Sequence, residues 1–198
     1  MLRRATTTIV NQNLIDNHMC IIIVRPAGAQ MPPKATLDRC AMLNPHGFGF
    51  ATKDRIYKTL SYEDFCKEIK TIGRHETVIL HFRYATHGSI KTENCHPFRD
   101  NETGVVFAHN GVLSIRPIDD MTDSETAFRT RIVPVIKEHG FGSTRFNYAN
   151  YDIIGSSRFA YIDKEGDYRL FGTFVHHHGC WYSNRNFMPF TARYSHAY

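Results

Sequence analysis

One cysteine stands where it could act as a nucleophile. Cys20 begins the run CIIIV, whose β-branched apolar residues favour a buried strand. A thiol at the end of such a strand can attack a carbonyl carbon if a base removes its proton. The alternative is a structural role, because a buried cysteine often serves only as a small apolar side chain.

A second polar group follows another expected strand. The segment RYATHG at Arg83–Gly88 comes directly after the apolar run TVILHF. The planar guanidinium of Arg83 suits a carboxylate, and Thr86 and His87 add hydrogen-bonding groups. Loops at strand ends often carry functional groups, so this segment is a candidate substrate site. It could instead be a capped strand end with a surface arginine.

Two further motifs have both a functional and a structural interpretation. In His109-Asn110-Gly111 the Asn110 amide and the Gly111 backbone N–H could hold a negative oxygen. Asn-Gly is also the strongest short signal for a hairpin turn. In the segment TDSET at 122–126 the acids could bind an ammonium group, or they could simply begin a helix. The segment NCHPF at 94–98 could be an ordinary loop.

The elements that must position these residues indicate an α+β protein with antiparallel sheets, because strands and helices do not alternate regularly. Expected helices cover 36–43, 61–72 and 122–138. Expected strands are a run from Cys20 to Val24, a pair within 50–60, and segments at 77–83, 104–108, 158–163, 168–174 and 180–183. The tetrapeptide KEGD at 164–167 predicts a hairpin turn.

Taken together, five motifs resemble the class II glutamine amidotransferase family. They occur in the family's order, and the resemblance spans about residues 20–128. The segments SSRFAYIDKEG at 156–166 and GCWYSN at 179–184 are similar to short stand-alone versions often encoded by phages. The five motifs are Met19-Cys20 with IIIV, RYATHG at 83–88, NCHPF at 94–98, AHNG at 108–111 and TDSE at 122–125.

The resemblance implies a fold and a chemistry. The fold is the N-terminal-nucleophile type, a four-layer αββα sandwich of two antiparallel sheets between helices. Cys20 would attack the glutamine side-chain amide and form a thioester, with its own free α-amino group as the base. The resemblance also implies substrate-binding roles and an oxyanion hole: Asn110 and Gly111 would hold the oxyanion, Arg83 the substrate α-carboxylate and Asp123 the α-ammonium, while Thr86 and His87 would shape the pocket.

The sequence departs from this family's pattern at the start. Ile21 follows the cysteine where the family usually has glycine, and Tyr84 stands where tryptophan is frequent. Residues 1–19 precede the cysteine and are polar, and we expect them to be a propeptide or an untranslated stretch ahead of a start at Met19. They could also stay attached. Residues 20–198 form the expected glutaminase-like domain.

Composition excludes several other classes. No apolar run is long enough to cross a bilayer, and five widely spaced cysteines form neither a disulfide framework nor a CxxC pair. The net charge of +5 comes from scattered basic residues, so nucleic-acid binding is not expected. Three adjacent histidines at 176–178 would point to alternating faces of a strand and cannot all reach one metal ion. We expect no cofactor, no metal, and a cytoplasmic location, that of the host cell if a phage encodes the chain.

The expected function is therefore glutamine hydrolysis to glutamate and ammonia, by an enzyme that is either free-standing or supplies the ammonia to a separate synthase. A related hydrolase acting on another γ-glutamyl or amide substrate is a variant of this hypothesis. The alternative from another class is a non-catalytic protein of the same fold that acts as an interaction or virion structural component.

Overall fold

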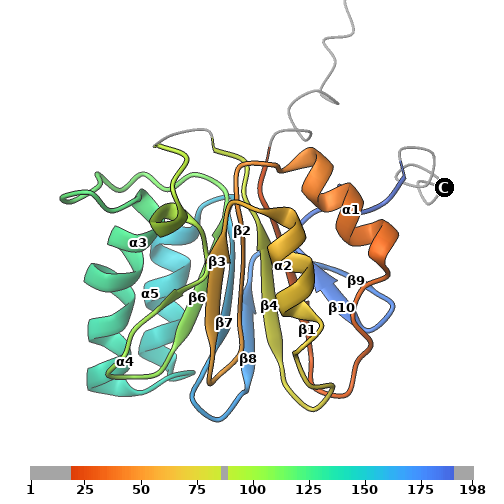
Figure 1. The fold of residues 1–198 in the computed structure, drawn as a ribbon. Helices are drawn as coiled ribbons and strands as arrows, with labels where there is room; N and C mark the ends of the chain where they lie inside the picture. The colour runs from red at the N-terminus through yellow and green to blue at the C-terminus, as the bar shows by residue number, and fades with distance from the viewer. Residues whose placement is uncertain (1–18, 86–88, 190–198) are drawn as a thin grey trace, which may run out of the picture.

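The computed structural model describes residues 19–85 and 89–189 and contains two antiparallel sheets with helices on their outer faces (Figure 1). The strands are β1 (Ile21–Arg25), β2 (Phe48–Ala51), β3 (Ile56–Thr59), β4 (Val78–Phe82), β5 (Phe98–Arg99), β6 (Val106–Asn110), β7 (Arg158–Ile162), β8 (Tyr168–Phe171), β9 (Val175–His177) and β10 (Cys180–Tyr182). The helices are α1 (Lys34–Leu43), α2 (Tyr62–Ile69), α3 (Asp123–Ala127), α4 (Val133–His139) and α5 (Thr144–Ile154), with a π-helical turn at Phe128–Ile132 and a 3₁₀ turn at Thr92–Asn94.

Strand β1 has a central place in the larger sheet, whose order is β3-β2-β4-β1-β10-β9. It pairs with β4 from Ile21 opposite Phe82 to Arg25 opposite Val78, and on its other side with β10. All five of its residues are buried. The smaller sheet has the order β5-β6-β7-β8, so that β6 lies between β5 and β7.

Alternation along β1 divides its side chains between two cores. Ile21 and Ile23 pack with residues of α1 and α2, whereas Ile22 and Val24 pack against β6 and β7 of the other sheet. Successive strand residues point to opposite faces, so a strand with apolar residues at every position must be covered on both sides. The layer between the sheets contains small and branched residues, among them Ala108 and Ala160.

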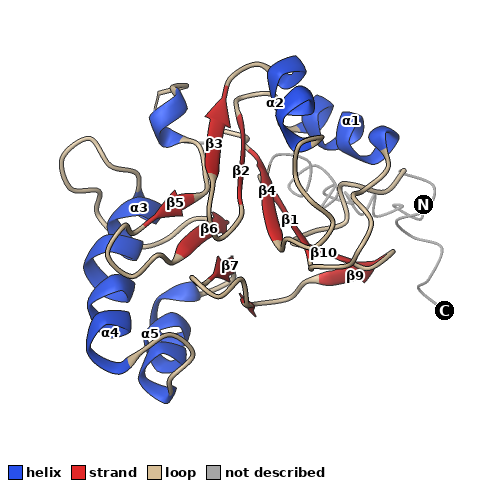
Figure 2. Ribbon diagram, turned by 60° about the horizontal axis from the view of Figure 1, so that its bottom comes forward, coloured by secondary structure: helices blue, strands red, loops and turns tan. Residues whose placement is uncertain are grey.

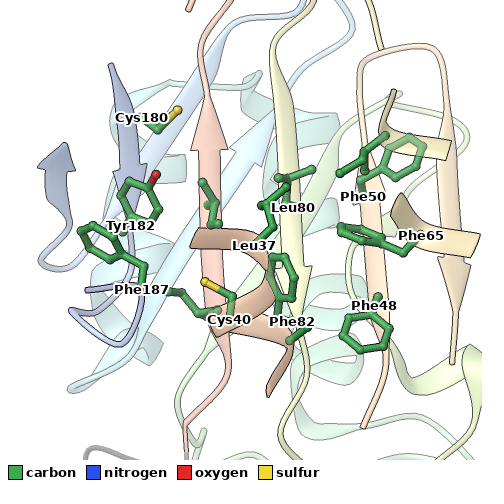
Figure 3. Packing of buried hydrophobic residues seen from close by; sticks show 14 of the residues in the cluster. Leu37, Cys40, Phe48, Phe50, Phe65, Leu80, Phe82, Cys180, Tyr182 and Phe187 are labelled. Atoms are coloured by element: carbon green, nitrogen blue, oxygen red, sulfur yellow. The ribbon is translucent and has the colours of Figure 1, made fainter. Parts of the chain in front are cut away.

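Aromatic side chains fill the two outer layers. Under α1 and α2, Phe65 lies 5.3 Å from Phe82 and 5.8 Å from Phe48 between ring centroids (Figure 3). Under α3 to α5, Phe107 and Phe128 stack at 5.0 Å. The order of layers is therefore helices, sheet, sheet, helices, which Figure 2 shows nearly along the strands.

The expected α+β class with two antiparallel sheets is confirmed, and the arrangement is consistent with an N-terminal-nucleophile fold. The predicted hairpin at 164–167 is present between β7 and β8, where Asp163 Oδ1 accepts from the backbone N–H groups of residues 165, 166 and 167. None of the described helices has the length and apolar character needed to cross a membrane. All five cysteines are free.

Several elements differ from the expectations, and strands β5 and β9 were not predicted. Strand β6 begins later than expected and runs on through Asn110. Helix α5 was not predicted, although Ser143 caps it by accepting from the Phe146 N–H at 3.1 Å. The single helix expected over 122–138 is divided by the π turn. Pro134 explains this local change, because it lacks the N–H that an α-helix needs at that position.

Phe65→Ala is expected to lower the free energy of unfolding by about 3–5 kcal/mol, because the ring is fully buried between α2 and the larger sheet and its loss leaves a cavity. Urea denaturation followed by circular dichroism measures the change. Tyr148→Ala, at a side chain that is 68% exposed on α5, is the control and should change stability by less than about 0.5 kcal/mol. Equal losses in the two variants would contradict the assigned core.

Candidate active site

The ends of several strands meet at a pocket of about 470 Å³. Cys20 lies just before β1, and Arg83 just after β4, so the antiparallel pairing of these strands places them at the same edge. The residues after β6 and the start of α3 close the pocket. Its wall includes four of the predicted site residues, Cys20, Arg83, Gly111 and Asp123. Thr86 and His87 lie outside the described residues.

The Cys20 thiol lies against the backbone of Tyr84. The Tyr84 N–H donates to Sγ at 3.3 Å, and Sγ lies 3.5 Å from the Tyr84 carbonyl oxygen. Burial raises the pKa of this thiol to about 11, although the Tyr84 backbone and the Arg83 charge act in the opposite direction. The thiol is therefore protonated at neutral pH, and a base must take its proton before or during an attack.

Ser183 and Asn184 fix the backbone around the cysteine. Asn184 Nδ2 donates to the Cys20 carbonyl at 2.9 Å. Ser183 Oγ accepts from the Ile22 N–H at 2.8 Å and from Asn110 Nδ2 at 2.9 Å, so it joins β1 to the end of β6. Sequence reasoning missed both residues as parts of the site. Their signal was the segment GCWYSN at 179–184, which the resemblance included without giving either residue a role.

Asn110 and Gly111 do not form a hairpin turn, so that structural alternative is wrong. Asn110 is the last residue of β6 and pairs with Arg158 of β7, and the next element is α3. Its side chain is 1% exposed, and Oδ1 has no hydrogen-bond partner among the described residues. Nδ2 has a second N–H besides the one that faces Ser183.

Gly111 is required by its backbone and by its neighbour. Its φ is +142°, and a Cβ there would lie 2.2 Å from Ser157 Oγ and 3.0 Å from Ser157 Cα. A side chain at position 111 would therefore collide with Ser157. The collision would move the backbone of Gly111, which lines the pocket, or that of Ser157. Because glycine has no side chain, nothing on residue 111 itself covers its backbone N–H.

Asp123 begins α3 and is held by backbone donors. Oδ2 accepts from the Leu113 N–H at 3.0 Å, and Oδ1 accepts from the Ser124 N–H at 2.8 Å. The helix cap predicted for this segment is present as well, since Thr122 Oγ1 accepts from the Glu125 N–H at 3.2 Å. Oδ1 also accepts from the Ser124 hydroxyl at 3.2 Å, so Oδ2 is the oxygen that keeps a further lone pair for a cationic ligand.

Arg83 is 5% exposed and is fixed through both backbone and side chain. Its N–H donates to the Gly47 carbonyl at 2.8 Å, and Nη1 donates to the Ser89 carbonyl at 3.2 Å. His46 supports the same turn, because its Nδ1 accepts from the Ala85 N–H at 2.9 Å and its ring contacts the Tyr84 ring in a tilted arrangement, 4.8 Å between centroids. The structural alternative, a surface arginine, is therefore wrong.

Three buried histidines lie beneath the pocket. His96 lies 4.5 Å from His81 and 6.2 Å from His109 between ring centroids. Burial lowers the pKa of His81 to about 3 and that of His109 to about 4, and it lowers the pKa of His96 as well. These rings are neutral at pH 7. Among the described residues, neither ring nitrogen of His96 has a hydrogen-bond partner.

Within residues 19–85 and 89–189, no group of three or more histidine, cysteine or acidic side chains is placed to hold a metal ion. The charged side chains of the pocket wall instead have both signs, with Arg83 and Lys91 alongside Asp119, Asp120 and Asp123. Such a mixed wall suits a zwitterion, because each end of the ligand can meet an opposite charge.

Comparison with known families agrees with this chemistry. A family model described as glutamine amidotransferases class-II matches residues 65–148, which is less than half of the chain. The matched segment contains Arg83, Asn110, Gly111 and Asp123, whereas Cys20 lies before it. The match indicates a domain related to glutamine amide hydrolysis. It gives no support to the phage likeness.

The three buried histidines predict a stability that falls as the pH falls below about 6.5, the usual histidine pKa. Below that pH the unfolded chain binds protons that the folded chain excludes, down to about pH 4 for His109 and about pH 3 for His81. For each ring, the free energy of unfolding should then fall by about 1.4 kcal/mol per pH unit. Urea denaturation between pH 7 and pH 5 measures the slope.

The variant His96→Phe separates the contribution of a buried histidine to the pH dependence of stability from the contribution of the carboxylates. The variant should lose less stability than the wild type between pH 7 and pH 5, because one excluded proton is removed and phenylalanine suits the neighbouring Phe98 ring. His75→Phe, at an exposed histidine, is the matched control and should keep the wild-type slope. An unchanged slope in His96→Phe would refute this explanation.

Proposed function

We propose that the chain hydrolyses the side-chain amide of glutamine to glutamate and ammonia, with Cys20 as the nucleophile. The observation that carries this proposal is one pocket that brings together a thiol, a guanidinium, a carboxylate and a glycine N–H from four separate segments. The class II glutamine amidotransferase match supports the choice of substrate. A zwitterionic head group suits Arg83 and Asp123, and a neutral amide suits the thiol.

The proposed reaction has two stages. Cys20 Sγ attacks the amide carbon while its proton passes to the α-amino group of the same residue. The oxyanion accepts hydrogen bonds from the Gly111 N–H and from Asn110 Nδ2. Collapse of this intermediate releases ammonia, which takes the proton, and leaves a thioester. Water then attacks the thioester carbon, glutamate leaves, and the thiol is restored.

Recognition of glutamine depends on its two charged ends. The Arg83 guanidinium would bind the α-carboxylate through paired N–H donors. Asp123 would bind the α-ammonium through the lone pair that Oδ2 keeps free. We propose that Thr86 and His87, which follow Arg83 in the chain, take part in substrate binding.

The mechanism requires Cys20 to be the first residue. An α-amino group titrates at about pH 8 and a thiol at about 8.5, so proton exchange between free groups is nearly balanced. A peptide bond to Met19 converts this amine into an amide, which is no base near neutral pH. Burial of the thiol makes the need for a base greater. We therefore propose that residues 1–19 are absent from the active form, through cleavage or through a start at Met19 followed by its removal.

The proposal has two consequences, one for the fate of the ammonia and one for the range of substrates. The released ammonia could pass to a separate synthase that uses it as a nitrogen donor. The mixed charges of the pocket wall also suit other γ-glutamyl amides, which share the same head group.

A second candidate is a non-catalytic protein of the same fold, acting in an interaction or as a virion component. The observation that favours it is the peptide bond between Met19 and Cys20 in this chain, which removes the base. This form would bind amino acids or partners without turnover.

A chain that begins at Cys20 should release glutamate from glutamine, whereas the chain with residues 1–19 attached should not. Cys20→Ala in the shortened chain should reduce the rate to background, because no thioester can form. Enzymatic measurement of glutamate gives the rate. The control is Cys40→Ala, which removes a thiol from α1 and should keep activity. Full activity of Cys20→Ala would reject the nucleophile.

Asp123→Asn should reduce kcat/KM for glutamine by about 10-fold to 100-fold, because a charged hydrogen bond to the ammonium contributes about 1.5–3 kcal/mol. The informative comparison uses glutaric acid monoamide, which lacks the α-amino group. Its kcat/KM should change little in the variant. An equal reduction for both substrates would mean that Asp123 acts only through the backbone that it holds.

A further inference from the structure

A second cavity, of about 370 Å³, lies at the opposite end of β1 from the nucleophile. Its wall comes from the loop after β1, the start of α1, the end of α2 and the loop that follows α2. Cys20 precedes β1 and Arg25 ends it, so five residues at about 3.3 Å each separate the two sites by roughly 17 Å. The proposed glutaminase chemistry leaves this cavity unexplained.

The charges on this wall all have one sign. Arg25, Lys34, Lys70 and Arg74 line the cavity, and none of its described lining residues is acidic. Lys34 is neutralised in part by Asp38, which lies 2.7 Å away and outside the lining. Lys70 and Arg74 form no ion pair with any other described residue, although Arg74 Nε donates to the Gly28 carbonyl at 2.8 Å. Their charges are therefore not neutralised by a carboxylate.

Arg25 is the unusual member of this group, because it is 2% exposed. Nη2 donates to the carbonyl oxygens of Gly73 and Glu76 at 2.9 and 2.8 Å, and Nε has no partner among the described residues. The Glu76 carboxylate is turned to the Gly73 N–H instead. Buried charges are normally paired with an opposite charge, and the described residues give Arg25 only carbonyl dipoles.

The rest of the wall is apolar or carries further positive potential. Met31, Leu37, Ile69 and Ile72 supply an apolar surface beside the cations. Helix α1 begins here without a side-chain cap and without an acidic residue in its first turn. The positive end of its dipole therefore adds to the potential of the basic side chains.

We propose that this cavity binds a small organic anion with an apolar body, such as an aromatic or aliphatic carboxylate, sulfonate or phosphate. The acidic head would lie against Arg25, Lys70 and Arg74, and the apolar body against Met31, Leu37 and Ile72. A role for Arg25 in tying loops together explains its bonds to carbonyls. It does not explain why Lys70 and Arg74, neither of which has a carboxylate partner among the described residues, lie around an apolar cavity of ligand size.

The test uses 8-anilinonaphthalene-1-sulfonate as the probe and fluorescence as the readout. The full chain should bind one equivalent saturably, and binding should weaken as salt is raised, because the exposed cations are screened. The matched probe is N-phenyl-1-naphthylamine, which has the same rings without the sulfonate. It should bind much more weakly. Equal binding of both probes would reject an anion site.

Charge reversal locates the site on the protein. Lys70→Glu combined with Arg74→Glu should weaken probe binding by about tenfold or more, because two attractive charges become repulsive. Lys53→Glu combined with Lys164→Glu makes the same change of net charge in turns at other places and should keep the wild-type affinity. Equal weakening by both pairs would mean a non-specific charge effect and would overturn the proposal.

Cys66 gives an independent readout, because its partly exposed thiol lines this cavity. Bound probe should slow alkylation of Cys66 by iodoacetamide in the full chain, as followed by peptide mass spectrometry, and should not do so in the Lys70→Glu and Arg74→Glu variant. Binding without protection of Cys66 would place the probe elsewhere. Neither readout depends on glutamine turnover, so the outcome is separate from that of the proposed glutaminase.

Discussion

The pairing of β1 with β4 and β10 decides where Cys20, the proposed nucleophile, lies. Ile21 opposite Phe82 brings Cys20 to the Tyr84 backbone, and Ser183 after β10 joins the same end of β1 to Asn110. A shift of one residue in this register would exchange the side chains that β1 directs to the two cores, because successive strand residues point to opposite faces. Packing on both sides of β1 therefore also fixes the geometry of the pocket.

Burial sets the chemistry that this geometry permits. It raises the pKa of the Cys20 thiol and lowers the pKa values of His81 and His109, so the thiol and the imidazoles are neutral at pH 7. Fixed charges remain at the pocket wall in Arg83 and Asp123. The site therefore supplies charges for a zwitterionic ligand, while the attacking thiol depends on a base. In our proposal that base is created only when Cys20 becomes the first residue.

Much of this arrangement could be predicted from the sequence. The apolar run of β1, the strand before Arg83 and the cap before Asp123 are local signals, and each marks an element that carries a site residue. The family resemblance then predicted that these elements meet at one site, which hydrophobic periodicity alone could not do. Gly111 was identified as a functional residue for its N–H, but its close approach to Ser157 depends on the fold.

The parts that were missed depend on contacts between distant segments. Ser183 and Asn184 act through β1 and β6, more than seventy residues away in the chain, and no local pattern reveals that. The Asn-Gly turn signal was overridden because pairing with β7 extends β6 through Asn110. Helix α5 follows two glycines and contains aromatic and asparagine residues that favour helices weakly, so tertiary packing decides its structure.

The most direct test of the central claim is the intact mass of the protein, expressed from its own gene, before and after exposure to a glutamine analogue with a diazoketone in place of the amide. We predict a chain that begins at Cys20 and gains one equivalent of the analogue, without its nitrogen, on that residue. A chain that keeps residues 1–19 and is labelled equally fast, or a label on another residue, would contradict the account.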